Sequence, residues 1–165
     1  MKIKIILIFF IIINSCKDTD LIIENVNFSE STLEYCTASI SNPLFLKIKG
    51  SEVLILLISS VLPYENGVTI RYFDQSTSLV YRKYDSNVTK EYFCSILTPS
   101  SPNLLTELLP VNGELEITTK LSLNESGEIT YLNYDLKVLN LLLENENGDT
   151  LIQDTLELGS YGYPL

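Results

Sequence analysis

The side chains in this sequence that could do chemistry are three cysteines and many carboxylates. The chain carries 3 Cys residues (Cys16, Cys36 and Cys94) and 21 Asp and Glu residues, and it has no His. Without an imidazole it can form no Ser-His-Asp triad, no Cys-His pair and no His-ligated zinc site. We expect no catalytic residue, no metal site and no cofactor; the alternative is a calcium site built from clustered Asp, Glu and Asn oxygens.

Paired carboxylates are the catalytic device that needs no histidine. Glycosidases use two Asp or Glu residues whose carboxyl groups lie about 5 Å or about 6.5–9.5 Å apart. Glu65, Glu91 and Glu107 fall in expected loops or at strand edges, but no motif singles out a pair. We therefore expect that the protein is not an enzyme.

The first residues have the pattern of an export signal. Lys2 and Lys4 precede an unbroken apolar run over residues 5–13, and the small Ser15 follows it. A charged start, a short apolar core and a small residue are typical of a secretory signal peptide. The run is about half of the roughly 20 apolar residues that a membrane span needs. We expect residues 1–15 to be a helical signal peptide.

The end of this segment resembles the lipobox of bacterial lipoproteins. Ile13 stands three positions before Cys16, Asn14 and the small Ser15 lie between them, and Cys16 follows where cleavage belongs. The resemblance implies that the Cys16 thiol takes a diacylglyceryl group and that the new amino group is acylated, for example with palmitate. Two or more acyl signals anchor a protein stably, so a lipid-anchored membrane protein is expected.

Lys17, Asp18 and Asp20 follow the lipidated position directly. A lysine and acidic residues there resemble the surface-export signal of Bacteroidota-type lipoproteins. The resemblance implies a lipoprotein of the outer membrane that is exposed at the cell surface, with residues 16–20 as its tether. The alternative is a plain acidic tether that keeps the domain solvated on the periplasmic side.

The two remaining cysteines, Cys36 and Cys94, are expected to pair. Export places them in an oxidising compartment, where a disulfide is the default. A bond closing a loop of this length stabilises the fold by about 4 kcal/mol on the chain-entropy model. The competing interpretation is two buried free thiols.

The net charge of the whole chain is −10. Removal of the leader also removes Lys2 and Lys4, so the mature chain is more acidic still. An acidic chain without a basic run argues against nucleic acid as a partner.

Alternating apolar and polar residues predict about eight to ten short strands and no long amphipathic helix. In residues 44–49, Leu44, Leu46 and Ile48 lie opposite Lys47 and Lys49. The alternation changes phase after Val138, which predicts a β-bulge. Further strands are expected over residues 33–40, 53–62, 114–123, 128–144 and, after the hairpin signal Asn147-Gly148, 150–158.

These strands predict an all-β fold, an antiparallel β-sandwich that forms a single domain over residues 21–165. We expect a hairpin between residues 68–74 and 79–85, a crossover loop at 98–110 and a tail at 159–165. Tyr92-Phe93-Cys94 resembles the Tyr-x-Cys of immunoglobulin domains. This resemblance implies an immunoglobulin-like or related sandwich whose disulfide joins its two sheets.

The function expected is that of a lipid-anchored cell-envelope protein with a non-catalytic binding or assembly role and an envelope protein as partner. The alternative is a glycan-binding or glycan-cleaving accessory lipoprotein, because exposed tyrosine rings can stack on sugars. The tyrosines considered for this role are Tyr72, Tyr81, Tyr84, Tyr161 and Tyr163.

Two tripeptides centred on Thr150 and Thr155 resemble the Asp-Thr-aliphatic O-glycosylation site of Bacteroidota-type exported proteins.

Overall fold

The computed structural model of the chain describes residues 22–24, 27–37, 39–97 and 99–165. The predicted signal peptide at 1–15, its expected helix and the tether at 16–20 lie outside these residues. The predicted lipidation and export residues Cys16, Lys17, Asp18 and Asp20 lie outside them as well.

β-Strands make up nearly all the regular structure of the described chain, so the all-β prediction is confirmed. Every strand pairing is antiparallel except that of β1 with β9, which is parallel. Across the described ranges, no helix is both long enough and apolar enough to cross a membrane. The elements are β1 (Ile22–Glu24), β2 (Leu33–Tyr35), β3 (Leu44–Lys49), β4 (Glu52–Ile58), β5 (Gly67–Tyr72), β6 (Thr77–Tyr84), α1 (Lys90–Cys94), β7 (Leu104–Leu123), β8 (Ile129–Glu144) and β9 (Thr150–Pro164).

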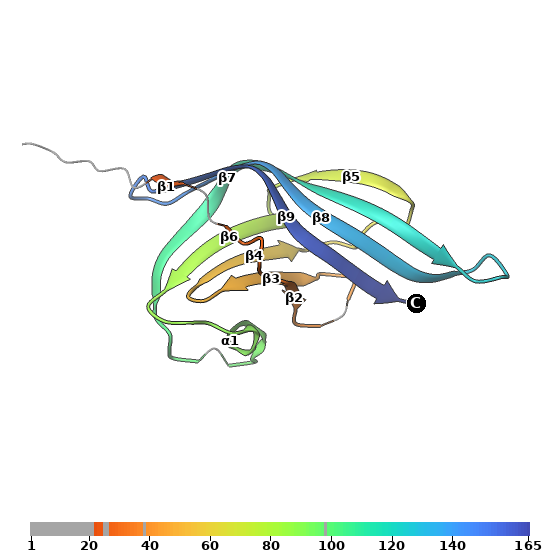
Figure 1. Cartoon of the computed structure of the whole chain (residues 1–165), viewed down its shortest axis with the longest axis horizontal. Coiled ribbons are helices and arrows are strands. Elements are labelled where there is room, and N and C mark those ends of the chain that lie inside the picture. Colours follow the sequence, from red (N-terminus) through yellow and green to blue (C-terminus); the bar gives the residue numbers. More distant parts are fainter. Residues whose placement is uncertain (1–21, 25–26, 38, 98) are drawn as a thin grey trace, which may run out of the picture.

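The strands form one curled sheet, and β7 joins its two halves (Figure 1). The first part of β7 pairs with β6, and its second part, from Glu114 on, pairs with β5 on one side and β8 on the other. The strand order is β1-β9-β8-β7-β6-β4-β3-β2, with β5 beside β7 off this path. The curl brings β2, near one end of the sheet, against β9, near the other.

The main core lies inside the curl, between the two halves of the sheet. The ring of Tyr161 from β9 meets that of Phe45 from β3 edge to face, with centroids 5.1 Å apart. The Tyr161 hydroxyl donates a hydrogen bond to the Ser39 carbonyl, and the Tyr134 hydroxyl donates to that of Pro63. Because each buried phenol has a partner, its burial adds apolar contact without leaving an unpaired polar atom.

Lys47 lies inside the curl, although the alternation predicts it on the outer face. It is buried, and its Nζ donates a hydrogen bond to the backbone carbonyl of Glu157 on β9, at 2.6 Å. Burial lowers the pKa of Lys47, and the Glu157 carboxylate partly offsets this effect. The prediction of an outward-facing Lys47 is wrong because the alternation assumes that only one face of β3 is covered. Both faces of β3 are covered in the structure.

The cover of the outer face is α1 with the loop before it. Leu46, Val53, Tyr84 and Val88 form a second buried cluster on the outer face of β3, β4 and β6. Tyr92 and Phe93 of α1 pack against the Tyr84 ring, with centroids 5.3 Å and 6.0 Å from it. α1 and the second cluster thus close one end of the outer surface of the sheet.

The predicted disulfide between Cys36 and Cys94 is confirmed. Cys94 ends α1, and Cys36 comes directly after β2. The bond therefore ties the helix to an edge strand. The immunoglobulin resemblance implied a bond between two sheets, and that implication is wrong.

Three local predictions are wrong. β5 and β6 do not form a hairpin, because β5 pairs with β7 and β6 pairs with β4. The expected loop at 98–110 ends early, since β7 already begins at Leu104. The expected tail at 159–165 is strand, because β9 continues to Pro164 beside β8.

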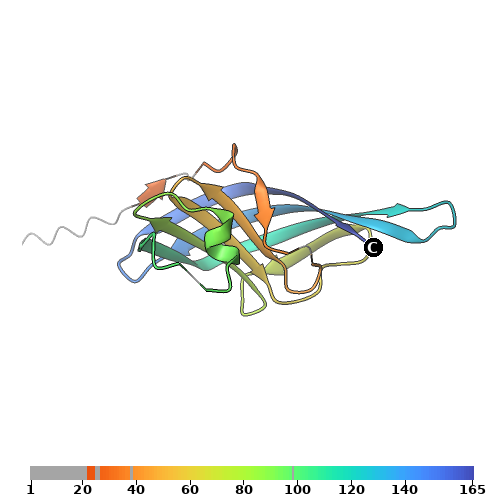
Figure 2. The ribbon, with the colours of Figure 1, turned by 90° about the horizontal axis from the view of Figure 1, so that it is seen from below.

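The predicted bulge in β8 and the predicted hairpin at Asn147-Gly148 are confirmed. Asn140 has a φ of 51°, and the β7–β8 register shifts opposite it, between Asn112 and Glu114. After this irregularity the buried side chains change from even to odd positions, starting with Leu141. The β7–β8 hairpin projects well beyond the rest of the sheet (Figure 2), and the hairpin at Asn147-Gly148 joins β8 to β9.

Candidate functional site

The two candidate glycosylation residues lie in different surroundings on β9. Thr150 is half-buried and stands between two partner residues, Ile22 of β1 and Glu144 of β8. Thr155 is exposed, beyond the last residue that pairs with β1. Of the two threonines, only Thr155 is therefore exposed at the surface of β9.

The three carboxylates considered for catalysis are not brought together. Glu65 lies beside a hollow before β5, Glu91 beside one at α1, and Glu107 beside one on β7. A hydrogen bond from the Thr89 side chain is the main cause that lowers the pKa of Glu91. These glutamates therefore do not form the paired site that glycoside cleavage needs.

The tyrosines considered for sugar stacking are mostly core residues. Tyr81, Tyr84 and Tyr161 are buried, Tyr163 is half-buried, and only Tyr72 is well exposed. Burial is the main cause that raises the pKa of Tyr81, whose hydroxyl donates a hydrogen bond to Glu52 Oε1 at 2.8 Å. The five rings therefore do not share one surface.

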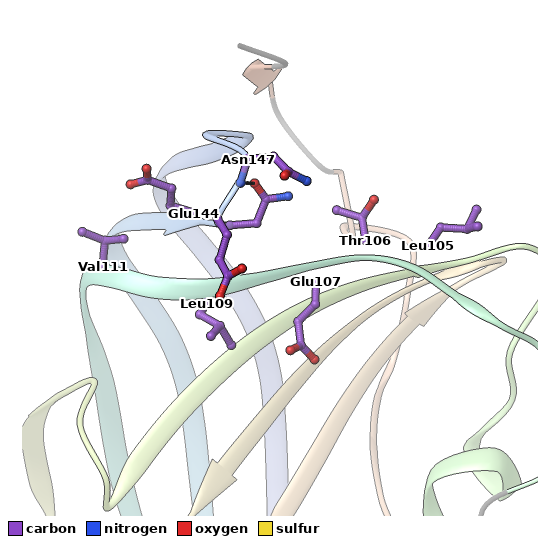
Figure 3. A pocket seen from close by; sticks show the side chains of 9 residues that line it. Leu105, Thr106, Glu107, Leu109, Val111, Glu144 and Asn147 are labelled. Carbon is purple, nitrogen blue, oxygen red and sulfur yellow. Dashed lines mark hydrogen bonds between the residues drawn. The ribbon is translucent and has the colours of Figure 1, made fainter. Parts of the chain in front are cut away.

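A hollow on the surface lies along the first part of β7, beside the turn that joins β8 to β9 (Figure 3). It is an open groove of about 550 Å³. Three aliphatic side chains from β7 line it, and all are exposed: Leu105 (61%), Leu109 (50%) and Val111 (59%). Its other lining residues are Thr106, Glu107, Glu144, Asn145, Glu146 and Asn147. We refer to this set as the β7 groove.

Strand pairing and a compact turn position the β7 groove. Leu109 of β7 is the register partner of Glu144, the last residue of β8. Asn145 Oδ1 accepts the backbone N–H groups of Asn147 and Asp149, each at 3.0 Å, so the turn is held by its own side chain. The positions of the aliphatic and acidic sides of the groove are therefore preorganised for binding.

The β7 groove carries an acidic side. Arg82 Nε donates to Glu107 Oε2 at 2.5 Å, so this carboxylate already has a cation. Within the described chain, no Lys or Arg forms an ion pair with Glu144 or Glu146. Those two carboxylates are available to a basic group on a partner.

Sequence reasoning missed the β7 groove because the prolines at 99, 102 and 110 favoured a loop. A signal was present: Leu105, Glu107 and Leu109 alternate with Thr106 and Leu108. In the structure Leu108 is buried and Leu105 and Leu109 are exposed, as that alternation implies.

The described residues contain no cluster of three or more Cys, Asp or Glu side chains that could hold a metal ion. Comparison of the chain with protein-family models, with curated proteins and with solved structures found no match. The function is therefore inferred from the residues of this chain.

Proposed function

We propose that this chain is a lipid-anchored cell-envelope protein with a non-catalytic binding or assembly role. The β7 groove is the observation that carries the binding role. Exposed apolar side chains gathered beside a polar rim are characteristic of interaction sites. The groove combines three such side chains with the unpaired carboxylates of Glu144 and Glu146.

The lining of the groove favours a protein partner over a glycan. None of the nine residues drawn in Figure 3 is aromatic, and flat rings are what sugars stack on. The groove instead offers apolar contacts to aliphatic side chains of a partner, through Leu105, Leu109 and Val111. Its carboxylates at Glu144 and Glu146 complement a basic side chain of the same partner. The partner we propose is a segment of another envelope protein that carries both.

We propose that Cys16 carries the lipid anchor. Lys17, Asp18 and Asp20 form the proposed export signal. The disulfide between Cys36 and Cys94 supports an oxidising compartment outside the cytosol. Six residue steps separate Cys16 from Ile22, a reach of at most about 22 Å. Because β1 pairs with the start of β9, the β7 groove lies at the tethered end of the sheet.

We also infer that the curled sheet is a variant of the β-sandwich, with β7 shared by its two layers. The support is the core between the halves of the sheet, where Phe45 from β3 packs against Tyr161 from β9. A solved crystal structure in which the two halves splay apart without a shared core would contradict this inference.

A photo-crosslinking residue at Leu109, in the full chain on intact cells, tests the binding role. We expect discrete adducts with an envelope protein, and we expect them to decrease when Glu144 and Glu146 are both changed to Gln. The same photo-residue at Leu123 is the matched control, since Leu123 is also an exposed leucine of β7 but lies far from the groove. Equal adducts at both positions would refute the proposal.

Two measurements on cells test the anchor and its side. Labelling with an alkyne fatty acid should mark the wild-type chain and not Cys16→Ala. Protease treatment of intact cells should digest the domain, whereas the variant with Ala at positions 17, 18 and 20 should keep its label and become protected. A domain that survives protease until the outer membrane is permeabilised would rule out surface display.

A further inference from the structure

We propose that β5 pairs antiparallel with the β5 strand of a second copy of this chain, about a two-fold axis at Ile70. This pairing would join two curled sheets edge to edge. The proposal depends on β5 alone, so it does not require the β7 groove or the lipid anchor.

β5 is an edge strand, and its outer edge has no strand partner in the described part of the chain. It pairs along Gly67–Tyr72 with β7 and with no other strand there. Every second residue of such an edge points its N–H and C=O groups outward, where another strand can bond them. Figure 1 shows β5 on the opposite side of β7 from β8.

β5 has little of the usual protection of an edge strand. Natural edges carry Pro, a bulge or charged side chains, including charges that point inward, and each of these hinders pairing. The pairing of β5 with β7 is regular, and its sequence Gly-Val-Thr-Ile-Arg-Tyr contains no Pro. Its single charge, Arg71, is turned inward and donates hydrogen bonds to Ser60 Oγ and to the Val61 carbonyl, at 2.6 Å and 2.8 Å.

The side chains of β5 complement a second copy of the same strand. Val68, Ile70 and Tyr72 lie on one face and are 61%, 41% and 67% exposed. An antiparallel pairing centred on Ile70 sets Ile70 against Ile70 and Val68 against Tyr72, so apolar side chains meet on that face. It sets Thr69 against Arg71 on the other face, and no like charges stand directly opposite each other. A two-fold interface requires this kind of self-complementarity.

The acidic residues next to β5 do not oppose this arrangement. Glu114 and Glu116 of β7 are the register partners of Tyr72 and Ile70. In the proposed dimer, the β7 strands of the two copies stand three strand spacings apart, about 14 Å. That separation exceeds the Debye length of about 8 Å at physiological ionic strength, so their repulsion is largely screened.

Site-specific crosslinking tests both the pairing and its register. Ile70→Cys is introduced into the full-length chain, expressed with export and extracted in detergent, and the protein is oxidised. Residues opposite each other in an antiparallel pair have Cβ atoms about 4.5–5.5 Å apart. We expect at least about tenfold more covalent dimer than from Leu123→Cys, a more exposed site away from β5, because only a formed pair raises the local thiol concentration.

The register gives a second, independent result. Two copies of Val68→Cys should not crosslink to each other, because four residues of offset place them about 14 Å apart. A mixture of Val68→Cys and Tyr72→Cys should crosslink, since these positions face each other. Self-crosslinking of Val68→Cys that equals the mixture, or Ile70→Cys that matches Leu123→Cys, would overturn the proposal.

A variant without a new thiol provides the final check. Ile70→Lys places two ammonium groups opposite each other in the dimer and replaces an exposed side chain in the monomer. We expect the sedimentation coefficient at high protein concentration to fall to that of a monomer, with an unchanged circular dichroism spectrum. A wild-type chain that sediments as a monomer over the whole concentration range would refute pairing with a second copy.

Discussion

Gly159 of β9 lies directly against Leu33 of β2, where the two ends of the curled sheet meet. A Cβ atom on Gly159 would stand 3.1 Å from Leu33 Cβ, and the φ of Gly159 is 128°, a value that other residues rarely adopt. We expect Gly159→Ala to lower the free energy of unfolding by about 1–3 kcal/mol, because strain and a close contact add. Urea unfolding measures this change.

Gly127→Ala is the matched control for backbone strain alone. Gly127 also has a positive φ, 81°, but nothing lies within 4 Å of the Cβ it would gain. If both variants lose the same stability, contact with Leu33 contributes nothing and the two ends of the sheet are not tightly packed.

The disulfide supports a second stability prediction. It joins Cys36 to Cys94 across a sequence separation of 58 residues, and it holds α1 over the second cluster. Replacing both cysteines with Ser should lower the free energy of unfolding by about 4 kcal/mol. The urea midpoint with and without reductant measures it, and reductant should leave the double variant unchanged. The prediction would be contradicted if reductant left the urea midpoint of the wild type unchanged.

The sequence predicts those features of the fold that depend on neighbouring residues. The phase change after Val138, the Asn147-Gly148 turn and the strand before it all appear in the structure. Each depends on a side-chain period or on turn chemistry within a few residues. The pairing of Cys36 with Cys94 follows from the expected export to an oxidising compartment, since only two cysteines remain beyond Cys16.

Features that depend on distant partners are not visible in the sequence. β5 and β6 look like a hairpin, but β7 is long and bent enough to take both strands along one side. Lys47 looks like a surface residue, yet the curl brings the Glu157 carbonyl over it. The β7 groove has a local and a distant part: the prolines before and within its strand favoured a loop, and Glu144 and Glu146 come from the β8–β9 hairpin.

The positions of the two candidate glycosylation residues lead to a further prediction. We expect an O-linked glycan on Thr155 and none on Thr150, because Thr150 is half-buried between β1 and β8. Mass spectrometry of peptides from the protein expressed in a glycosylating host checks this, with Thr155→Val as the control. A glycan on Thr150 would show that modification precedes folding of β9.

Buried phenols should make the fold sensitive to alkali. Burial is the main cause that raises the pKa of Tyr134 to about 12, and it also raises those of Tyr81, Tyr84 and Tyr161. A raised folded-state pKa gives stability that is complete below the unfolded value near 10 and is lost as pH rises toward 12. Lys47, whose pKa is lowered mainly by burial, acts in the opposite direction.

Tyr134→Phe isolates one of these phenols. At pH 7 the variant should be less stable than the wild type by about 1 kcal/mol, because the Pro63 carbonyl loses its donor. By pH 11 the wild type should have lost about 1 kcal/mol on account of Tyr134, so the difference between the two proteins should nearly vanish. Urea unfolding at pH 7, 9 and 11 measures it, with Tyr72→Phe as the control for an exposed ring. A difference that stays constant across this range would mean that Tyr134 ionises in the folded protein as it does in the unfolded chain.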